Sequence, residues 1–143
     1  MSKDASEFTL CIIKPDAVAN RNQAQILQRI LDEGFEIIAL RQQDLSKAQA
    51  EGFYAVHRER PFFGELVSYM TNGTVILAAL RRPDAVAHWR KVIGATDPRK
   101  AEAGTIRQKF GVDLTANAVH GSDSVENGLR ETAYFFVGSD LGR

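Results

Sequence analysis

Apolar segments with the length of strands alternate along this chain with segments of helical periodicity. Residues 8–13 and residues 74–80 are apolar almost throughout, which is typical of central strands in a sheet. Residues 35–40 and the pair 118–119 are two further strand candidates. The resulting order is strand, helix, strand, helices, strand, helix, loop, strand and helix. This βαββαβ pattern with additions predicts a four-stranded sheet with helices packed on it.

Five segments have the spacing of apolar residues that predicts helices. In the first, Ile26, Leu27, Ile30 and Leu31 recur at helical intervals, and Gly34 is expected to end the helix. Four more helices are predicted. One is capped by Ser46 and contains Tyr54, and a second covers residues 62–70 after Pro61. A third has Pro83 in its first turn, and a fourth covers residues 124–136.

The connecting segments carry two further signals. Pro15 follows the first strand, where it is expected to end the strand pairing and to force a turn. Residues 94–115 lack periodicity except for a short helical piece at 106–110, and a long irregular segment in a compact domain is usually a functional loop. The tail from residue 138 has no strong signal. We expect one α+β domain over residues 1–143.

Composition excludes several classes of protein. Eighteen basic residues balance 18 acidic ones, so no overall field favours DNA or an acidic membrane, and an anion site must be built locally. The one cysteine, Cys11, cannot form an internal disulfide, which suits a reducing cytosol. No apolar run approaches the ~18 residues needed to span a bilayer, and no signal peptide is present. We therefore expect a soluble, cytoplasmic protein.

The three histidines are the first candidates for chemistry. His57 lies among charged residues near a predicted helix end, and His88 lies off the apolar stripe of its helix, so both are expected at the surface. Neither has a partner at the spacing of zinc ligands, so a structural metal site is not expected. His120 stands between an apolar strand and the turn 121–124, where an imidazole can act as a nucleophile. The alternative is a strand-end histidine bonded to the turn.

The surroundings of His120 favour the nucleophile. Gly121 is expected to allow a close approach to a ligand or a positive φ. One of residues 122–124 can cap the following helix, whose N-terminal amides favour an anion nearby. Glu131 lies two helical turns beyond Ser124 on the same face, so its carboxylate can reach back and fix the tautomer of the imidazole.

Three cations form a second candidate group. Lys14 follows a central strand, Arg90 lies on the helix after Pro83, and Arg107 lies in the irregular segment. Guanidinium groups pair with two phosphate oxygens at once, so the three side chains would clamp a phosphate if they share a site. The alternative is that each of the three is an isolated charge at the protein surface.

One aromatic residue and three absent motifs bear on whether and how the chain binds a nucleotide. Phe62 follows Pro61 and is either a partly exposed core residue or a platform for a planar base. The sequence has no P-loop, no dinucleotide-binding glycine pattern and no Gly-x-Ser-x-Gly elbow. Nucleotide binding, if present, therefore uses another arrangement.

Five motifs in order give the chain a resemblance to nucleoside diphosphate kinases from residue 8 to about residue 136. They are Ile13-Lys14-Pro15-Asp16-Ala17-Val18, Arg60-Pro61-Phe62-Phe63, Gly94-Ala95-Thr96-Asp97-Pro98, Gly104-Thr105-Ile106-Arg107, and Asn117-Ala118-Val119-His120-Gly121-Ser122-Asp123-Ser124. The resemblance implies a ferredoxin-like βαββαβ fold, an α/β sandwich with a four-stranded antiparallel sheet covered by helices.

The resemblance also implies an activity and the residues that perform it. His120 would carry the terminal phosphoryl group from a nucleoside triphosphate, typically ATP, to a diphosphate by a ping-pong mechanism. The matching positions are Lys14, Tyr54, Arg90, Thr96, Arg107 and Asn117 around the phosphates and ribose, Phe62 with its apolar neighbours Leu66 and Val112 at the base, and Glu131 and Ser122 beside the histidine. Mg²⁺ would be carried on the nucleotide phosphates, with no metal site on the protein. Dimers would assemble into a tetramer or hexamer.

The chain departs from the family pattern at four positions. Arg81 and Arg82 stand where the family usually has Glu-Gly, Ala103 stands where proline is frequent, and Ala24 where glycine is frequent. None is a catalytic match, so activity is expected to survive. Arg81 and Arg82 would alter surface charge or subunit contacts, and Ala103 would loosen the loop that carries Arg107.

Two alternatives remain at the level of sequence. A nucleotide-binding protein without turnover would be expected to lack His120, Lys14 or Arg107, and all three are present. A nucleic-acid-binding protein would need a local basic patch, for which Arg81-Arg82 and Arg90-Lys91 are the candidates. The zero net charge argues against it, and neither a membrane nor a specific nucleic acid is expected as a partner.

Overall fold

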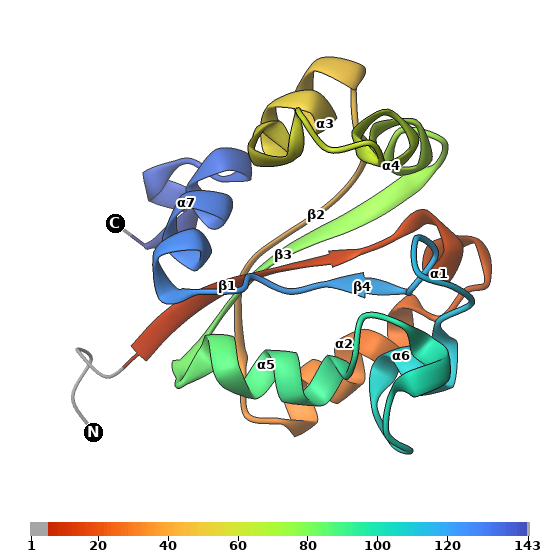
Figure 1. The fold of residues 1–143 in the computed structure, drawn as a ribbon. Coiled ribbons are helices and arrows are strands. Elements are labelled where there is room, and N and C mark those ends of the chain that lie inside the picture. Colours follow the sequence, from red (N-terminus) through yellow and green to blue (C-terminus); the bar gives the residue numbers. More distant parts are fainter. Residues whose placement is uncertain (1–5, 143) are drawn as a thin grey trace.

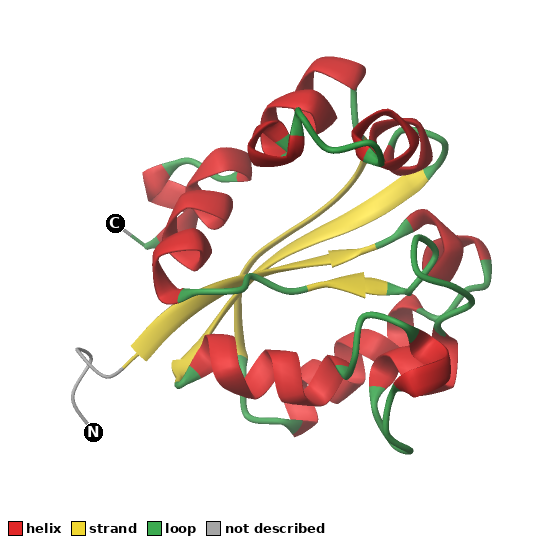
Figure 2. Cartoon of the chain, in the orientation of Figure 1, coloured by secondary structure: helices red, strands yellow, loops and turns green. Residues whose placement is uncertain are grey.

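The computed structural model describes residues 6–142 and has three layers, with one sheet between two layers of helices (Figures 1 and 2). The strands are β1 (Ser6–Ile13), β2 (Glu36–Asp44), β3 (Thr74–Pro83) and β4 (Val119–His120). They lie in the order β2-β3-β1-β4, and each neighbouring pair is antiparallel. This order confirms the predicted ferredoxin-like α+β fold.

The helices divide between the two faces of the sheet. They are α1 (Pro15–Ala19), α2 (Gln23–Asp32), α3 (Lys47–Phe53), α4 (Phe63–Met70), α5 (Ala85–Ile93), α6 (Ile106–Phe110) and α7 (Val125–Phe135), with short 3₁₀ turns at Ala55–His57, Pro98–Lys100 and Gly138–Leu141. Figure 1 shows α2, α5 and α6 on one side of the sheet and α3, α4 and α7 on the other.

The central strand β1 supplies both cores because successive side chains of a strand point to opposite faces. Cys11 and Ile13 join the cluster under α2 and α5, where Trp89 is fully buried. Leu10 and Ile12 join the cluster under α3, α4 and α7. Most of the apolar residues that predicted the helices lie in these two clusters. The helical periodicity in the sequence therefore marks the side of each helix that packs on the sheet.

The structure corrects two predictions that rested on proline. Pro15 ends β1 as predicted, but it begins the short helix α1 instead of a simple turn, because its fixed φ and missing N–H suit the first position of a helix. Pro83 is not in the first turn of α5. It is the last residue of β3, opposite Ser6, and α5 begins after Asp84.

The other histidines and the unusual arginines are engaged in contacts. His57 ends a 3₁₀ turn and is half-buried, with its ring centroid 5.5 Å from that of Phe62. His88 is not at the surface as predicted. It is half-buried, and its Nε2 lies 2.8 Å from Oε1 of Glu33, the residue that follows α2. Arg81 pairs with Glu36 at 3.3 Å. Arg82 donates to the carbonyl of Glu33 and lies over the ring of Phe35. The two arginines are therefore used within the fold and do not form a free basic patch.

One local feature was absent from the sequence-based expectations. The tail forms a 3₁₀ turn at Gly138–Leu141, and Leu141 is buried in the core below α7. No helix within residues 6–142 is long and apolar enough to cross a membrane.

Candidate active site

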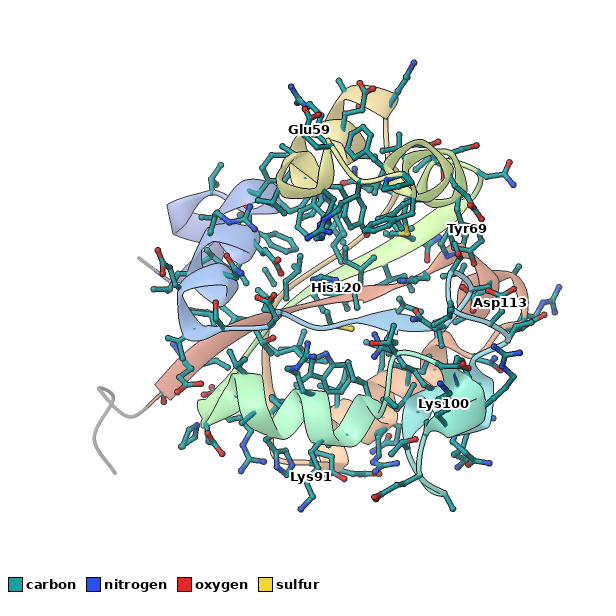
Figure 3. All side chains as sticks on the ribbon, viewed as in Figure 1. Glu59, Tyr69, Lys91, Lys100, Asp113 and His120 are labelled. Carbon is teal, nitrogen blue, oxygen red and sulfur yellow. The ribbon has the colours of Figure 1, made fainter. Side chains whose placement is uncertain are left out.

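His120 is the last residue of the edge strand β4 and pairs with Ile12 on β1. Its backbone carbonyl accepts a hydrogen bond of 3.2 Å from the indole of Trp89, which lies below the sheet on α5. Its ring lies on the opposite side, with the ring of Phe53 on α3 at a centroid distance of 5.4 Å (Figure 3). Residue 120 is therefore held through its backbone on one side of the sheet and through its ring on the other, and its side chain keeps 19% of its surface exposed.

The orientation of the imidazole is set by Glu131 on α7. Nε2 of His120 lies 2.8 Å from Oε1 of Glu131. Burial raises the pKa of Glu131, but the hydrogen bonds from His120 and Ser122 and the charges of His120 and Arg130 together lower it more. The pKa of Glu131 is therefore below its ordinary value. An ionised carboxylate only accepts hydrogen bonds, so Nε2 carries the ring proton in neutral His120. Nδ1 then holds the free electron pair and has no hydrogen-bond partner within residues 6–142.

Ser122 fixes Glu131 in turn. Its buried hydroxyl donates to Oε1 of Glu131 at 2.7 Å and accepts from the backbone N–H of Leu10 at 3.0 Å. The hydroxyl thus ties the carboxylate to β1. The helix that carries Glu131 can approach β1 because Gly128 has no side chain: a Cβ there would lie 2.1 Å from the carbonyl oxygen of Phe8.

The turn after His120 differs in one respect from the prediction. Gly121 does not have a positive φ, and its small size serves packing, since a Cβ there would lie 2.7 Å from the ring of Trp89. The cap of α7 is Ser124, whose hydroxyl accepts from the N–H of Asn127. The sequence left this choice open among residues 122–124.

Lys14 and Asn117 form a buried pair beside this turn. Nζ of Lys14 donates to Oδ1 of Asn117 at 2.8 Å, and the Asn117 amide donates to the carbonyls of Thr96 and Leu114. Burial lowers the pKa of Lys14 to about 8, with a further contribution from the charge of Arg107. The side chain is still mostly charged at neutral pH.

Arg107 lies on the short helix α6 and is also buried. Its guanidinium donates to the carbonyls of Gly94 and Val119, and its Nε has no partner among the described residues. Burial and, secondly, the neighbouring charge of Arg90 together lower the pKa of Arg107 to about 10. Arg90 itself is exposed. The pKa of Asp123, in the turn after His120, is lowered first by the hydrogen bond from Asn127, and the charge of Arg90 contributes. Lys14, Arg90 and Arg107 thus act on one region.

The remaining phosphate-side candidates lie at the edge of this region. Tyr54 follows α3 and is buried, and burial together with the charge of Glu131 raises the pKa of its hydroxyl. Thr96 is exposed, and its carbonyl is the one that Asn117 holds. Both lie next to residues that contact His120 or Lys14.

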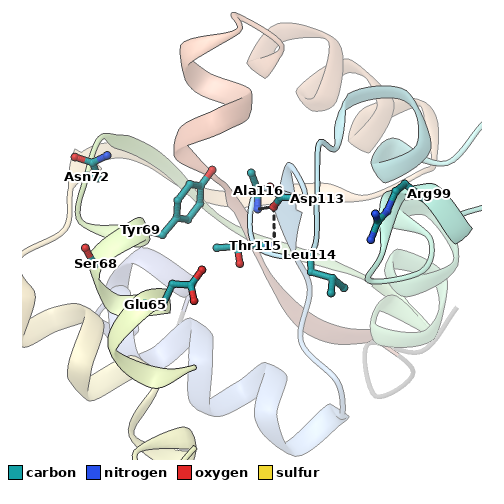
Figure 4. Close-up of a pocket in the computed structure, with 9 residues that line it drawn as sticks. All are labelled: Glu65, Ser68, Tyr69, Asn72, Arg99, Asp113, Leu114, Thr115 and Ala116. Carbon is teal, nitrogen blue, oxygen red and sulfur yellow. Dashed lines mark hydrogen bonds between the residues drawn. The ribbon is translucent and has the colours of Figure 1, made fainter. Parts of the chain in front are cut away.

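A groove of about 560 Å³ separates α4 from the loop before β4 (Figure 4). Its lining consists of Glu65, Ser68, Tyr69, Asn72, Arg99, Asp113, Leu114, Thr115 and Ala116. The loop side is shaped by a turn in which Oδ1 of Asp113 accepts from the N–H groups of Thr115 and Ala116. This turn leaves Leu114 56% exposed at the groove.

The base-side candidates fall in two places. Phe62 is 47% exposed immediately before α4, and Leu66 packs partly into the core from the same helix. Val112 lines a separate groove with Pro98, Arg99, Ala101, Ala103, Gln108 and Gly111. The sequence-based prediction did not select Leu114, an exposed apolar residue on the loop side of the groove beside α4.

No group of three or more His, Cys, Asp or Glu side chains within residues 6–142 is arranged to hold a metal ion. The carboxylates nearest to His120 are already engaged. Glu131 accepts from His120 and Ser122, and Asp123 accepts from the side chain of Asn127.

The ferredoxin-like sheet thus carries an oriented histidine, and the buried cations Lys14 and Arg107 bond to its strand and to the loops beside it, which are the kinds of group that phosphoryl transfer requires. The sequence profile described as "Nucleoside diphosphate kinase" matches residues 7–141. A nucleoside diphosphate kinase of Anaeromyxobacter dehalogenans is 54% identical over 132 residues, which is 92% of this chain and 90% of that protein. One of Desulfovibrio desulfuricans is 52% identical over 94% of this chain and 97% of its own length.

Solved structures of nucleoside diphosphate kinases have the same fold as this chain. The nucleoside diphosphate kinase of Aquifex aeolicus superposes with a TM-score of 0.92 at 43% identity, covering 94% of this chain and 98% of that one. A halophilic nucleoside diphosphate kinase from Halobacterium salinarum, solved in complex with CDP, gives 0.90 at 34% identity over 94% and 90%. This chain belongs to the nucleoside diphosphate kinase family, and it is an enzyme that transfers phosphoryl groups between nucleotides.

The buried ammonium of Lys14 predicts a measurable pH dependence of stability. Its pKa is about 8 in the folded protein and 10.5 ordinarily. Below pH 8 both states hold the proton, and between pH 8 and 10.5 only the unfolded chain does, so folding is favoured as the pH rises through this window. At ~1.36 kcal/mol per pKa unit, Lys14 adds about 2 kcal/mol to the free energy of unfolding between pH 7.5 and 9.5.

Urea unfolding of wild type and Lys14→Met at the two pH values measures this contribution, because other titrating groups cancel in the difference. The exposed lysine Lys47, replaced in Lys47→Met, is the matched control and should follow the wild type. Parallel pH dependences for wild type and Lys14→Met would show that the ammonium is not held as described.

Proposed function

We propose that the enzyme works by a ping-pong mechanism in which Nδ1 of His120 accepts the phosphoryl group. The observation that carries this proposal is the hydrogen bond from Nε2 to Glu131, because it leaves the electron pair of Nδ1 free. In the first half-reaction Nδ1 bonds to the γ-phosphorus, the bond to the β–γ bridging oxygen breaks, and the diphosphate leaves with that electron pair. In the second half-reaction a terminal oxygen of another diphosphate takes the phosphoryl group and restores the imidazole.

The charge of the transferring group is proposed to be stabilised by Lys14, Arg90 and Arg107. Phosphoryl transfer requires little covalent chemistry beyond the nucleophile, so positioned cations supply most of the catalysis. Lys14 and Arg107 lose little orientational freedom on binding, because each is held by hydrogen bonds to Asn117 or to backbone carbonyls. Tyr54 and Thr96 are proposed to complete the phosphate contacts, and Lys14 and Asn117 to contact the ribose.

Mg²⁺ is proposed to enter on the phosphates of the nucleotide. The carboxylates around His120 are engaged with other groups, which leaves the phosphate oxygens as its ligands. The metal would neutralise phosphate charge as the bond to the leaving group breaks. Tri- and diphosphates of any nucleoside are the proposed substrates.

The base is proposed to lie in the groove between α4 and the loop before β4. Phe62 supplies an exposed aromatic face immediately before α4, and Leu66 follows one turn later. These two residues adjoin Glu65, the first residue of α4 that lines the groove. From the loop side we propose Leu114 as the apolar contact, since it lines this groove and Val112 lines another. Stacking and apolar contact accept every base, which suits an enzyme that equilibrates many triphosphates.

We further propose that the protein is cytoplasmic and forms a homo-oligomer of dimers, a tetramer or a hexamer. The unpaired, buried thiol of Cys11 suits a reducing compartment. Strand β2 lies at the edge of the sheet, and the exposed side chains of Leu40 on β2 and Leu31 on α2 favour a neighbour there.

Incubation with γ-labelled ATP and Mg²⁺ is expected to leave a label on the protein that is labile in acid and stable in alkali. His120→Ala should lose this label and the exchange between ATP and GDP while keeping the wild-type circular dichroism. His88→Gln is the matched control, because His88 is also bonded to a glutamate, and it should retain the label. A wild-type protein that exchanges phosphate without any label would contradict the covalent mechanism.

The base contact is tested by comparing Leu114→Ala with Val112→Ala, two exposed apolar residues of the same loop. Loss of ~1–2 kcal/mol of apolar contact corresponds to roughly a tenfold rise in KM. We expect this rise for nucleoside diphosphates with Leu114→Ala, with kcat nearly unchanged and Val112→Ala close to wild type. The reverse ranking would restore Val112 as the contact.

A further inference from the structure

Ala118, between the ribose and nucleophile residues of the site, has an unusual backbone conformation. Its φ is +74°, and it is fully buried. The N–H of Val119 donates to the carbonyl of Asn117 at 2.9 Å, which closes a γ-turn around Ala118. This turn is strained for a residue with a side chain, so it persists only where the surrounding structure holds it.

The turn is held by the segment that follows β1. The N–H of Lys14 donates to the carbonyl of Ala118 at 2.8 Å. The N–H of Ala118 donates to Oδ2 of Asp16 at 3.0 Å. Both backbone groups of Ala118 are thus bonded to residues about a hundred positions earlier in the chain, and only one of these bonds depends on a side chain.

The carboxylate of Asp16 is itself fixed by Tyr69 on α4. The Tyr69 hydroxyl donates to Oδ1 of Asp16 and accepts from its N–H. Burial and the Asp16 charge raise the pKa of Tyr69, so the hydroxyl keeps its proton. Tyr69 also lines the groove proposed for the base and extends from α4 across it (Figure 4).

We propose that Asp16 is a positioning residue for the transfer reaction. Its carboxylate, held by Tyr69, keeps Ala118 in the γ-turn and thereby sets Asn117 and His120 relative to each other. This inference rests on the proposed role of His120. It goes beyond that role because it assigns the alignment of the nucleophile to a residue that contacts neither the imidazole nor the nucleotide phosphates.

The proposal predicts a loss of rate at saturating nucleotide. Displacement of a reacting group by about 1 Å can cost ~10²-fold in rate. Asp16→Ala is expected to lower the single-turnover rate of His120 phosphorylation by roughly that factor, and Asp16→Asn by less, because its amide oxygen can still accept from Ala118. Tyr69→Phe should lower the rate by a smaller factor in the same direction.

Rescue separates positioning from folding. Glycine adopts positive φ without the clash of a side chain, so Ala118→Gly added to Asp16→Ala should recover roughly tenfold of the lost rate. Asp32→Ala is the matched control, since Asp32 is an exposed aspartate bonded only to Gln28, and it should keep the wild-type rate. Rates are compared at a temperature where circular dichroism and urea unfolding show each variant to be folded.

The outcomes distinguish the two proposals. If wild type does not label at His120, the proposed mechanism fails. If wild type labels while folded Asp16→Ala labels at the same rate, only the inference about Asp16 is overturned. If Asp16→Ala does not fold, Tyr69→Phe and Asp16→Asn decide: wild-type rates for both overturn it. Rate loss without recovery by Ala118→Gly also overturns it, since the turn would not be the element that Asp16 holds.

Discussion

The hydrogen bond between Nε2 of His120 and Glu131 joins the last strand to the last helix, and the proposed chemistry depends on it. It fixes the tautomer, so one ring nitrogen carries the proton and the other is free to react. The bond exists because α7 packs closely on β1 through Gly128 and because Ser122 links the carboxylate to Leu10. The central strand β1 therefore contributes, through Leu10 and Ser122, to the orientation of the proposed nucleophile.

The cations depend on the same packing. The chain has no net charge, so its attraction for phosphate is local. Lys14 lies at the end of β1, and Arg107 is brought to it by carbonyls of Gly94 and Val119 from the loop and β4. Burial of these two charges costs free energy, which lowers the pKa of each, and the polyphosphate of the nucleotide is the anion proposed to compensate this cost.

Much of this could be predicted from the sequence, because the signals are local or motif-based. The apolar runs at β1 and β3 and the position of Glu131 two turns after Ser124 led to the observed fold and to the histidine–glutamate contact. Long-range contacts could not be predicted. The capacity of Asp16 to hold Ala118, the packing of Gly121 on Trp89, and the pairing of His88 with Glu33 each join segments that no periodicity relates. Pro83 was placed wrongly because a proline at the end of a strand and one in the first turn of a helix have the same local signature.

The central claim is that the hydrogen bond from Nε2 of His120 to Glu131 leaves Nδ1 free to accept the phosphoryl group. The most direct test is nuclear magnetic resonance of the phosphorylated enzyme with ¹⁵N-labelled histidine, kept at alkaline pH, in which the coupling to ³¹P identifies the nitrogen bonded to phosphorus. The account predicts phosphorus on Nδ1 and a proton on Nε2. Phosphorus on Nε2 would contradict it, because that nitrogen would then have left Glu131.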